Sequence, residues 1–171
     1  REIARKMNDS YGTDFPEPQS LKGTTRYVPS LLGEGKMSKS VDGSYISLSD
    51  DLKTIQKKLS GAPTDSGRGE MLPESGGVAN LLTFVEMFEG KEKRDEYENR
   101  YLSDGIRYGD LKSELAEAIY KELKPIQEKR AELAADKARI DRVIKEGAEK
   151  ARIVASATMA EVKEKMGFGD L

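Results

Sequence analysis

The sequence of 171 residues contains neither cysteine nor histidine. Without cysteine, disulfides and thiolate metal sites are excluded. Without histidine, a Ser-His-Asp triad and a histidine-ligated zinc site are excluded as well. No apolar run approaches the roughly 18 residues of a membrane span, and the first residues lack the apolar core of a signal peptide. These absences predict a cytoplasmic protein with no protein-bound metal.

The charges of the two signs are almost balanced. Lys and Arg number 29 and Asp and Glu 31, so the net charge is only -2. A charge this small gives no overall attraction to nucleic acid, and any polyanion would have to bind a local basic patch. Hydrophobic residues make up 36% and charged residues 35% of the chain, which is typical of solvated helices around a small core.

Apolar residues recur at helical spacing over most of the chain. They predict a helix that ends at Gly12, one over 49–60 with Ser49 as N-cap, a buried one over 78–90 and an exposed one over 91–105. From Asp110, predicted as an N-cap, the pattern continues to residue 167, with a kink or restart at Pro125. Gly147 and nearby alanines predict close packing of the last helix against another helix. Residues 13–44 are rich in Pro and Gly, and we expect at most a short strand within 24–32. The predicted fold class is mainly α, a helical bundle preceded by an irregular segment.

The stretch GEGKMSKSVDG, residues 33–43, places two lysines three positions apart between glycines. Lysine ammonium groups are compact charges, and Lys36 and Lys39 could address different oxygens of one polyphosphate. Ser38 and Ser40 could add hydroxyl donors, and an exposed Met37 could pack against a flat base. The composition of this loop, taken without its exact order, favours an ordinary solvated surface loop.

The pentapeptide KMSKS, Lys36–Ser40, is one of the two signature motifs of class I aminoacyl-tRNA synthetases. The flanking stretches RYVPSLLGEGKMSKS, YISLSDDLKTIQKKLSGAPTDS, GVANLLTFVEMF and LKSELAEAIYKELKPIQEKRAEL resemble bacterial tryptophanyl-tRNA synthetases. The resemblance extends from residue 1 to about residue 169. One departure follows the motif, where many members have Asp or Asn and this chain has Val41 and then Asp42. The departure leaves open how the downstream side of the loop is held.

The resemblance covers only the C-terminal portion of such an enzyme. It implies that residues 1–48 are the end of a Rossmann-type catalytic domain with the KMSKS loop, and that 49–171 form an anticodon-binding-type helical domain. The whole enzyme would activate tryptophan with ATP to tryptophanyl-adenylate and charge tRNA(Trp). This chain alone would be catalytically inactive and monomeric, whereas the whole enzyme would be a homodimer.

The resemblance also implies roles for individual residues. Lys36 and Lys39 would be catalytic, by stabilising the departing phosphates together with Mg²⁺ that accompanies ATP. The ATP-binding residues would be Val28, Lys36, Met37, Ser38, Lys39 and Ser40, with Val28 lining the adenine site. Two alternatives stay open, a stand-alone helical module that binds RNA or protein and a tyrosine-specific relative.

Other residues have two interpretations each. The loop from Thr64 to Gly69 could contact phosphate, but a connector with local turn bonds is favoured. Tyr97 and Tyr101 could stack on RNA bases, but packing with hydrated hydroxyls is favoured. Asp50 and Asp51 are interpreted as helix-terminus charges. A stripe for tRNA phosphates or a solvated face could be formed by Lys121, Lys124, Lys129, Arg130, Lys137, Arg139 and Arg142.

Overall fold

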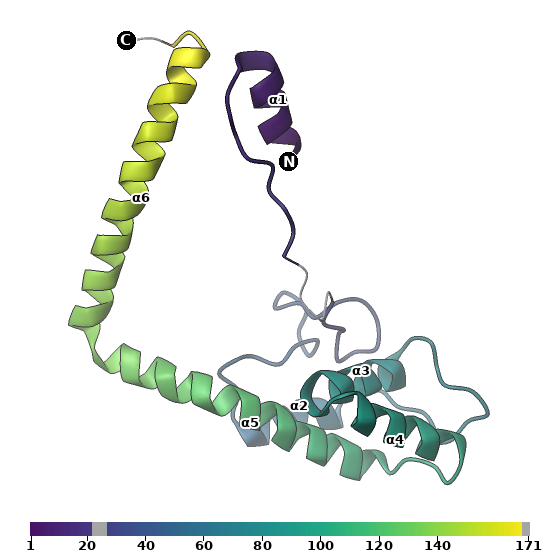
Figure 1. Ribbon diagram of the computed structural model, residues 1–171. Coiled ribbons are helices and arrows are strands. Elements are labelled where there is room, and N and C mark those ends of the chain that lie inside the picture. Colours follow the sequence, from purple (N-terminus) through teal and green to yellow (C-terminus); the bar gives the residue numbers. More distant parts are fainter. Residues whose placement is uncertain (22–26, 169–171) are drawn as a thin grey trace. The chain divides into compact units, whose positions relative to one another are not determined.

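The computed structural model describes residues 1–21 and 27–168. Within them it contains six helices and no strand longer than an isolated bridge. The helices are α1 (Glu2–Tyr11), α2 (Leu52–Ser60), α3 (Gly77–Glu89), α4 (Lys91–Leu102), α5 (Tyr108–Ala135) and α6 (Lys137–Lys165), labelled in Figure 1. The mainly α prediction is confirmed. Of the short strand predicted within 24–32, residues 24–26 lie outside the described residues.

The chain divides into two compact units. One holds Gly23–Ala131, and the other holds Arg1–Lys22 and Glu132–Leu171. This division differs from the functional division at residue 48, which stays a prediction. Among the described helices, none is long and apolar enough to cross a membrane.

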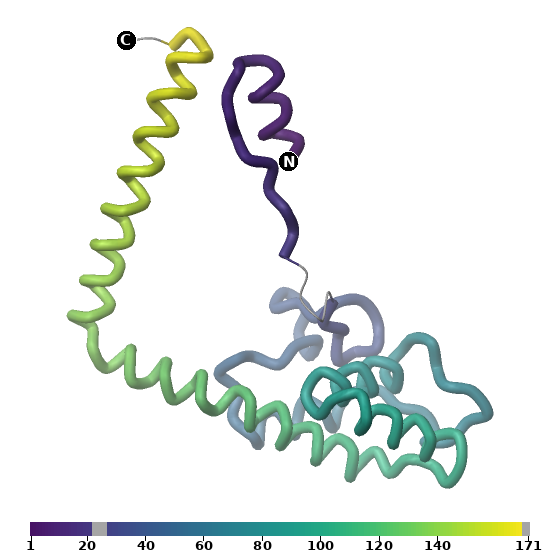
Figure 2. Tube along the Cα trace, in the orientation of Figure 1, coloured from purple at the N-terminus to yellow at the C-terminus, as the bar shows by residue number. Residues whose placement is uncertain are grey.

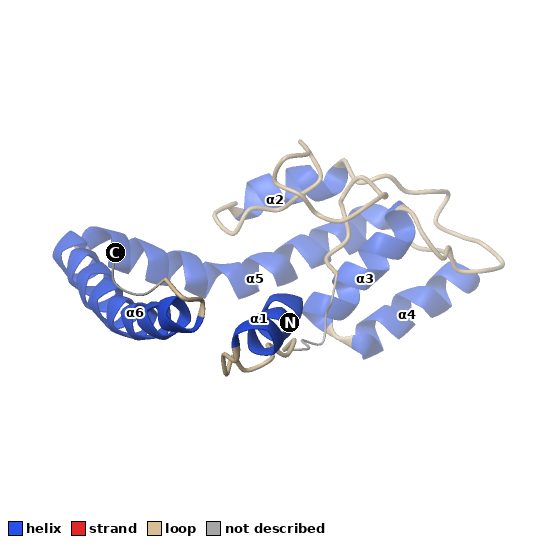
Figure 3. Ribbon diagram, turned by 90° about the horizontal axis from the view of Figure 1, so that it is seen from above, coloured by secondary structure: helices blue, strands red, loops and turns tan. Residues whose placement is uncertain are grey.

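The core lies in the larger unit and is shared by α2, α3, α4 and α5 (Figure 3). Helices α3 and α4 pack against each other across Gly90, whose positive φ of 93° turns the chain between them. Helices α2, α3 and α5 contribute buried aliphatic side chains and Phe84, and α4 contributes two buried tyrosines. The set is Ile55, Leu59, Leu81, Leu82, Phe84, Val85, Tyr97, Tyr101, Leu111, Leu115 and Ile119. Figure 2 follows the chain from residue 27 to α2 as an irregular coil beside these helices.

Two predicted helix starts are corrected. Asp51, and not Ser49, caps α2, because its carboxylate accepts the Thr54 amide at 2.8 Å. Asp50 instead accepts a 2.6 Å bond from the Lys58 ammonium. Helix α5 begins at Tyr108, two residues before the predicted cap Asp110. The interpretation of Asp51 as a helix-terminus charge is confirmed.

Helix α5 continues through Pro125 without a break. Proline removes the bond to the carbonyl four residues earlier, here that of Lys121. Both residues are exposed, so water can reach that carbonyl. The helix ends only at Ala135, and Asp136 caps α6 by accepting the Arg139 amide at 2.9 Å. Of the kink or restart predicted at Pro125, the restart is therefore wrong, and the kink stays a prediction.

In the smaller unit, α1 ends at Gly12, which has φ 65°, as predicted. The turn that follows is held by Asn8, whose side chain bonds Thr13 and Phe15, and by an Arg5–Glu17 ion pair of 2.6 Å. No described residue of α6 is buried, and Gly147 has no neighbour within 4 Å of a Cβ placed on it. The predicted close packing of α6 against another helix is thus wrong for this chain, because no described element covers α6.

Candidate functional site

The KMSKS motif lies on a short hairpin-like loop. Pro29 and Lys36 form an antiparallel bridge, the Met37 amide donates to the Val28 carbonyl at 2.9 Å, and the Ser30 amide donates to Gly35 at 3.0 Å. Between these partners the chain reverses through glycines at 33 and 35 with φ of 92° and 69°. These angles favour glycine, which explains the glycines on this side of the motif.

A buried serine holds the downstream side of the loop. The Ser44 hydroxyl donates to the Ser38 carbonyl at 2.7 Å and accepts the Ser38 amide at 3.2 Å. The Val41 amide adds a 3.1 Å bond to the same carbonyl. In the part of the chain that the structure describes, the carboxylate of Asp42 accepts only the neighbouring Gly43 amide, at 3.0 Å. The departure from the family pattern at Val41 and Asp42 therefore leaves the loop closed through Ser44.

The backbone is thus fixed while the two lysine side chains point out. Lys36 and Lys39 are exposed, and neither has a carboxylate partner among the described residues. Ser40 is exposed as well, and Ser38 is half-buried. The two ammonium groups are consequently free to meet an incoming anion without first leaving an ion pair.

Two predicted nucleotide contacts, Met37 and Val28, lie on the same bridge. Met37 is half-buried and packs against the hydrophobic core, so the expectation of an exposed methionine is wrong. Its amide already bonds Val28, and its side chain closes the loop onto the helices. Val28 is 38% exposed. The roles of both in ATP binding stay predictions.

The loop is seated on α3. A Cβ at Gly33 would lie 3.1 Å from the Gly77 amide nitrogen and 3.3 Å from a Pro63 side-chain carbon. The side-chain amide of Asn80 donates to the Ser30 carbonyl at 2.8 Å. The sequence reasoning missed Asn80 and Ser44. The available signal for Asn80 was an amide in the first turn of the most apolar helical stretch of the chain.

Asp65 connects the loop after α2 to α4 and α5. Its carboxylate accepts the hydroxyls of Tyr101 and Tyr108, both at 2.6 Å, and the Gly67 amide at 2.7 Å. Burial opposes ionisation of Asp65, but these hydrogen bonds outweigh it and lower the pKa of the carboxyl. The connector interpretation of residues 64–69 is confirmed for Asp65, whose bonds also reach two helices.

The tyrosine pair of α4 is buried. Tyr97 donates to Glu114 at 2.8 Å, so both Tyr97 and Tyr101 pack in the core with carboxylate partners, where hydrated hydroxyls were expected. Burial and the bond to Glu114 raise the pKa of Tyr97, which keeps its hydroxyl a donor. Base stacking on these rings would require the core to open.

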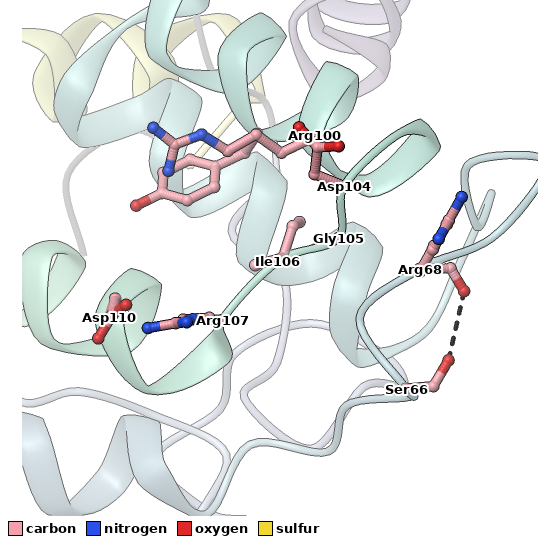
Figure 4. Close-up of a pocket in the computed structure, with 9 residues that line it drawn as sticks. Ser66, Arg68, Arg100, Asp104, Gly105, Ile106, Arg107 and Asp110 are labelled. Atoms are coloured by element: carbon pink, nitrogen blue, oxygen red, sulfur yellow. Dashed lines mark hydrogen bonds between the residues drawn. The ribbon is translucent and has the colours of Figure 1, made fainter.

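A surface hollow lies between residues 66–68, the end of α4 and the start of α5 (Figure 4). It measures about 610 Å³ and is lined by Ser66, Arg68, Tyr97, Arg100, Asp104, Gly105, Ile106, Arg107 and Asp110. Figure 4 shows the side chains of Arg68 and Arg107 well separated, with Arg107 near Asp110. Arg100 is already paired with Glu96. The hollow thus carries charges of both signs that do not converge on one point.

The basic side chains of α5 and α6 are exposed and partly neutralised. Lys124 lies 3.9 Å from Glu128, and Arg139 lies 3.7 Å from Glu132. These pairs agree with a solvated face of mixed charge, and a tRNA stripe stays a prediction. Among the described residues, no group of three or more Asp or Glu side chains could hold a metal ion.

Comparison with known proteins assigns the chain to a family. The family model for tRNA synthetases class I (W and Y) matches residues 1–124. The chain belongs to this family. The tryptophan–tRNA ligase of Porphyromonas gingivalis is 43% identical over an alignment of 174 positions, which covers 98% of this chain and 52% of that ligase. The ligase of Caldanaerobacter subterraneus is 39% identical with the same coverage. The chain therefore spans about half the length of these curated relatives.

Solved class I synthetases have the same fold. The tryptophanyl-tRNA synthetase of Mycoplasma pneumoniae matches with a TM-score of 0.77 and 26% identity, over 99% of this chain and 52% of that one. The Campylobacter jejuni enzyme, crystallised with ADP and tryptophan, matches with a TM-score of 0.70 and 29% identity, over 98% of this chain and 52% of that one. The resemblance to tryptophanyl-tRNA synthetases is confirmed.

Proposed function

We propose that this chain is the C-terminal part of a tryptophan–tRNA ligase and supplies its KMSKS loop and tRNA-facing helices. In the whole enzyme, the carboxylate of tryptophan attacks the α-phosphate of ATP, tryptophanyl-adenylate forms and pyrophosphate leaves. The aminoacyl group then passes to tRNA(Trp). The observation that carries the proposal is the pair of exposed ammonium groups, which have no ion-pair partner within residues 1–21 and 27–168, on a loop with a fixed backbone.

The chemistry of the two lysines follows from their placement. Negative charge develops on the bridging oxygen and on the β- and γ-phosphates as the bond to the α-phosphate breaks. Lys36 and Lys39 lie three positions apart on the same loop and carry no competing carboxylate among the described residues, so both charges can act on that group. Mg²⁺ would arrive with ATP and share this role. The Campylobacter jejuni relative crystallised with ADP and tryptophan supports both as ligands.

The proposal includes the partners and the assembly implied by the resemblance. ATP, tryptophan and tRNA(Trp) would bind the whole enzyme, which would be a cytoplasmic homodimer joined mainly through its catalytic domain. This chain alone would be monomeric and inactive, because its loop lacks the opposing wall of the ATP site.

Replacing Lys39 with alanine in the full-length gene product tests the catalytic role. We expect the rate constant of tryptophan-dependent ATP–pyrophosphate exchange to fall by about 10²-fold or more, with the KM for tryptophan unchanged. Lys53→Ala, an exposed lysine of α2, is the control and should leave both constants unchanged. A raised KM for tryptophan with an unchanged rate would contradict the assigned role.

A further inference from the structure

We propose that Asn80 of α3 is a positioning residue that sets the placement of the lysine loop. The catalytic consequence of this inference rests on the proposed function, whereas its structural part does not. Asn80 is half-buried, and its side-chain amide crosses from the helical core to the loop, where it donates to the Ser30 carbonyl at 2.8 Å.

The recipient of this bond is the base of the loop. Ser30 is 2% exposed, its amide donates to the Gly35 carbonyl at 3.0 Å, and its hydroxyl accepts the Leu32 amide at 3.0 Å. The amide, carbonyl and hydroxyl of Ser30 are thus bonded, and among the described residues Asn80 supplies the one hydrogen bond to Ser30 that comes from outside the loop. Water has almost no access to Ser30, so it cannot replace the amide when Asn80 is removed.

The bonds of Ser30 lead directly to the first lysine. Gly35, the partner of the Ser30 amide, precedes Lys36, and Lys36 is bridged to Pro29, the residue before Ser30. A rotation of the Ser30 peptide therefore moves both strands of the bridge that carries Lys36. Because catalytic groups must lie within a fraction of an ångström of their working geometry, such a shift acts on the rate and leaves tryptophan binding unchanged.

The same core contains a matched control. Gln127 of α5 also donates its side-chain amide to main-chain carbonyls, those of Leu48 and Asp50, both at 2.9 Å. Leu48 and Asp50 follow the loop in the sequence, after Tyr45 and Ile46. The side chain of Ile46, which comes between the loop and these two residues in the sequence, packs against the core. Gln127→Ala thus removes an amide-to-backbone bond of the same kind away from the lysines.

The variants Asn80→Ala, Asn80→Asp and Gln127→Ala are made in the full-length gene product. Asparagine and aspartate have nearly the same shape, but an ionised carboxylate cannot donate to the Ser30 carbonyl. The first readout is hydrogen–deuterium exchange of peptides within 28–38. We expect faster exchange in both Asn80 variants and unchanged exchange in Gln127→Ala. The second readout is tryptophan-dependent ATP–pyrophosphate exchange, where kcat should fall about tenfold in both Asn80 variants with an unchanged KM for tryptophan.

The outcomes separate this inference from the proposed function. If the unmodified protein shows no ATP–pyrophosphate exchange with any amino acid, the proposed function fails. Hydrogen–deuterium exchange still decides whether Asn80 holds the loop. Unchanged deuterium exchange of 28–38 in the Asn80 variants would overturn the positioning role. So would equal losses of kcat in Gln127→Ala and Asn80→Ala, because the effect would then be one of general stability.

Discussion

Replacing Ser44 with alanine should loosen the lysine loop and destabilise the larger unit by a measurable amount. Ser44 is 1% exposed, and its hydroxyl makes two of the bonds that close the loop, one to the amide and one to the carbonyl of Ser38. Alanine is no larger than serine, so the change introduces no clash. Its cost is the loss of these two hydrogen bonds.

The magnitude follows from the burial of the hydroxyl. A net contribution of about 0.5–1.5 kcal/mol for each hydrogen bond gives a loss of about 1–3 kcal/mol in the free energy of unfolding. Ser60 is the matched control, because its hydroxyl also bonds a main-chain carbonyl, that of Lys57 at 2.7 Å, but the residue is exposed. Water can replace that bond, so Ser60→Ala should change the free energy by no more than about 0.5 kcal/mol.

Urea unfolding of both variants, followed by helical circular dichroism, measures the difference. Fitted with one common slope, the Ser44→Ala curve should shift to lower urea and the Ser60→Ala curve should overlay that of the unmodified protein. Coincident curves for all three proteins would refute the reasoning, because the loop would then be held by something other than the Ser44 hydroxyl.

Four further variants test the rest of the fold. Asp65→Asn should be less stable than the unmodified protein at pH 7, because the lowered pKa of Asp65 stabilises the folded state at pH values above 3.8, the ordinary pKa of an aspartate. The difference in melting temperature between the two proteins should narrow as the pH falls below 3.8. Glu89→Gln should be more stable at pH 7, since burial raises the pKa of Glu89 and its charged form is disfavoured, and this gain should vanish below pH 4.5 in the same melting series. Gly77→Ala should lower the free energy of unfolding, measured with urea, by about 3 kcal/mol or more, because the new Cβ would lie 1.9 Å from the Pro63 carbonyl oxygen. Gly147→Ala has open space around it and should raise the free energy of unfolding by about 0.5–1 kcal/mol. Equal stability of the two glycine variants would contradict the close contact at Gly77.

The helices were predictable because their signals are local. The apolar stripes of Ile55 and Leu59 or of Leu111 and Leu115 recur at helical spacing, and each stripe is buried as expected. Helix ends were less predictable, since Ser49, Asp50 and Asp51 are all acceptable caps and the choice depends on tertiary partners. The ammonium of Lys58 occupies Asp50, which leaves the carboxylate of Asp51 to accept the Thr54 amide.

The candidate site could be predicted from the sequence only at the residues of a recognisable motif. The pentapeptide Lys36–Ser40 located the loop, but nothing near it in the sequence points to Asn80, whose bond to Ser30 spans 50 residues. Ser44 is one of several serines in its region, and only its burial distinguishes it. Side chains that support a loop from a distance have no spacing rule, so they become visible only when the fold brings them together.

Amino-acid-dependent ATP–pyrophosphate exchange is the first measurement to make on the proposal that this loop serves a tryptophan–tRNA ligase. The measurement uses the full-length gene product that contains these residues, with tryptophan and tyrosine in parallel and Lys36→Ala, Lys39→Ala as a double variant. We expect ATP–pyrophosphate exchange with tryptophan, no exchange with tyrosine, and loss of the tryptophan-dependent exchange in the double variant. Exchange with tyrosine alone, or undiminished exchange without the two lysines, would contradict the proposal.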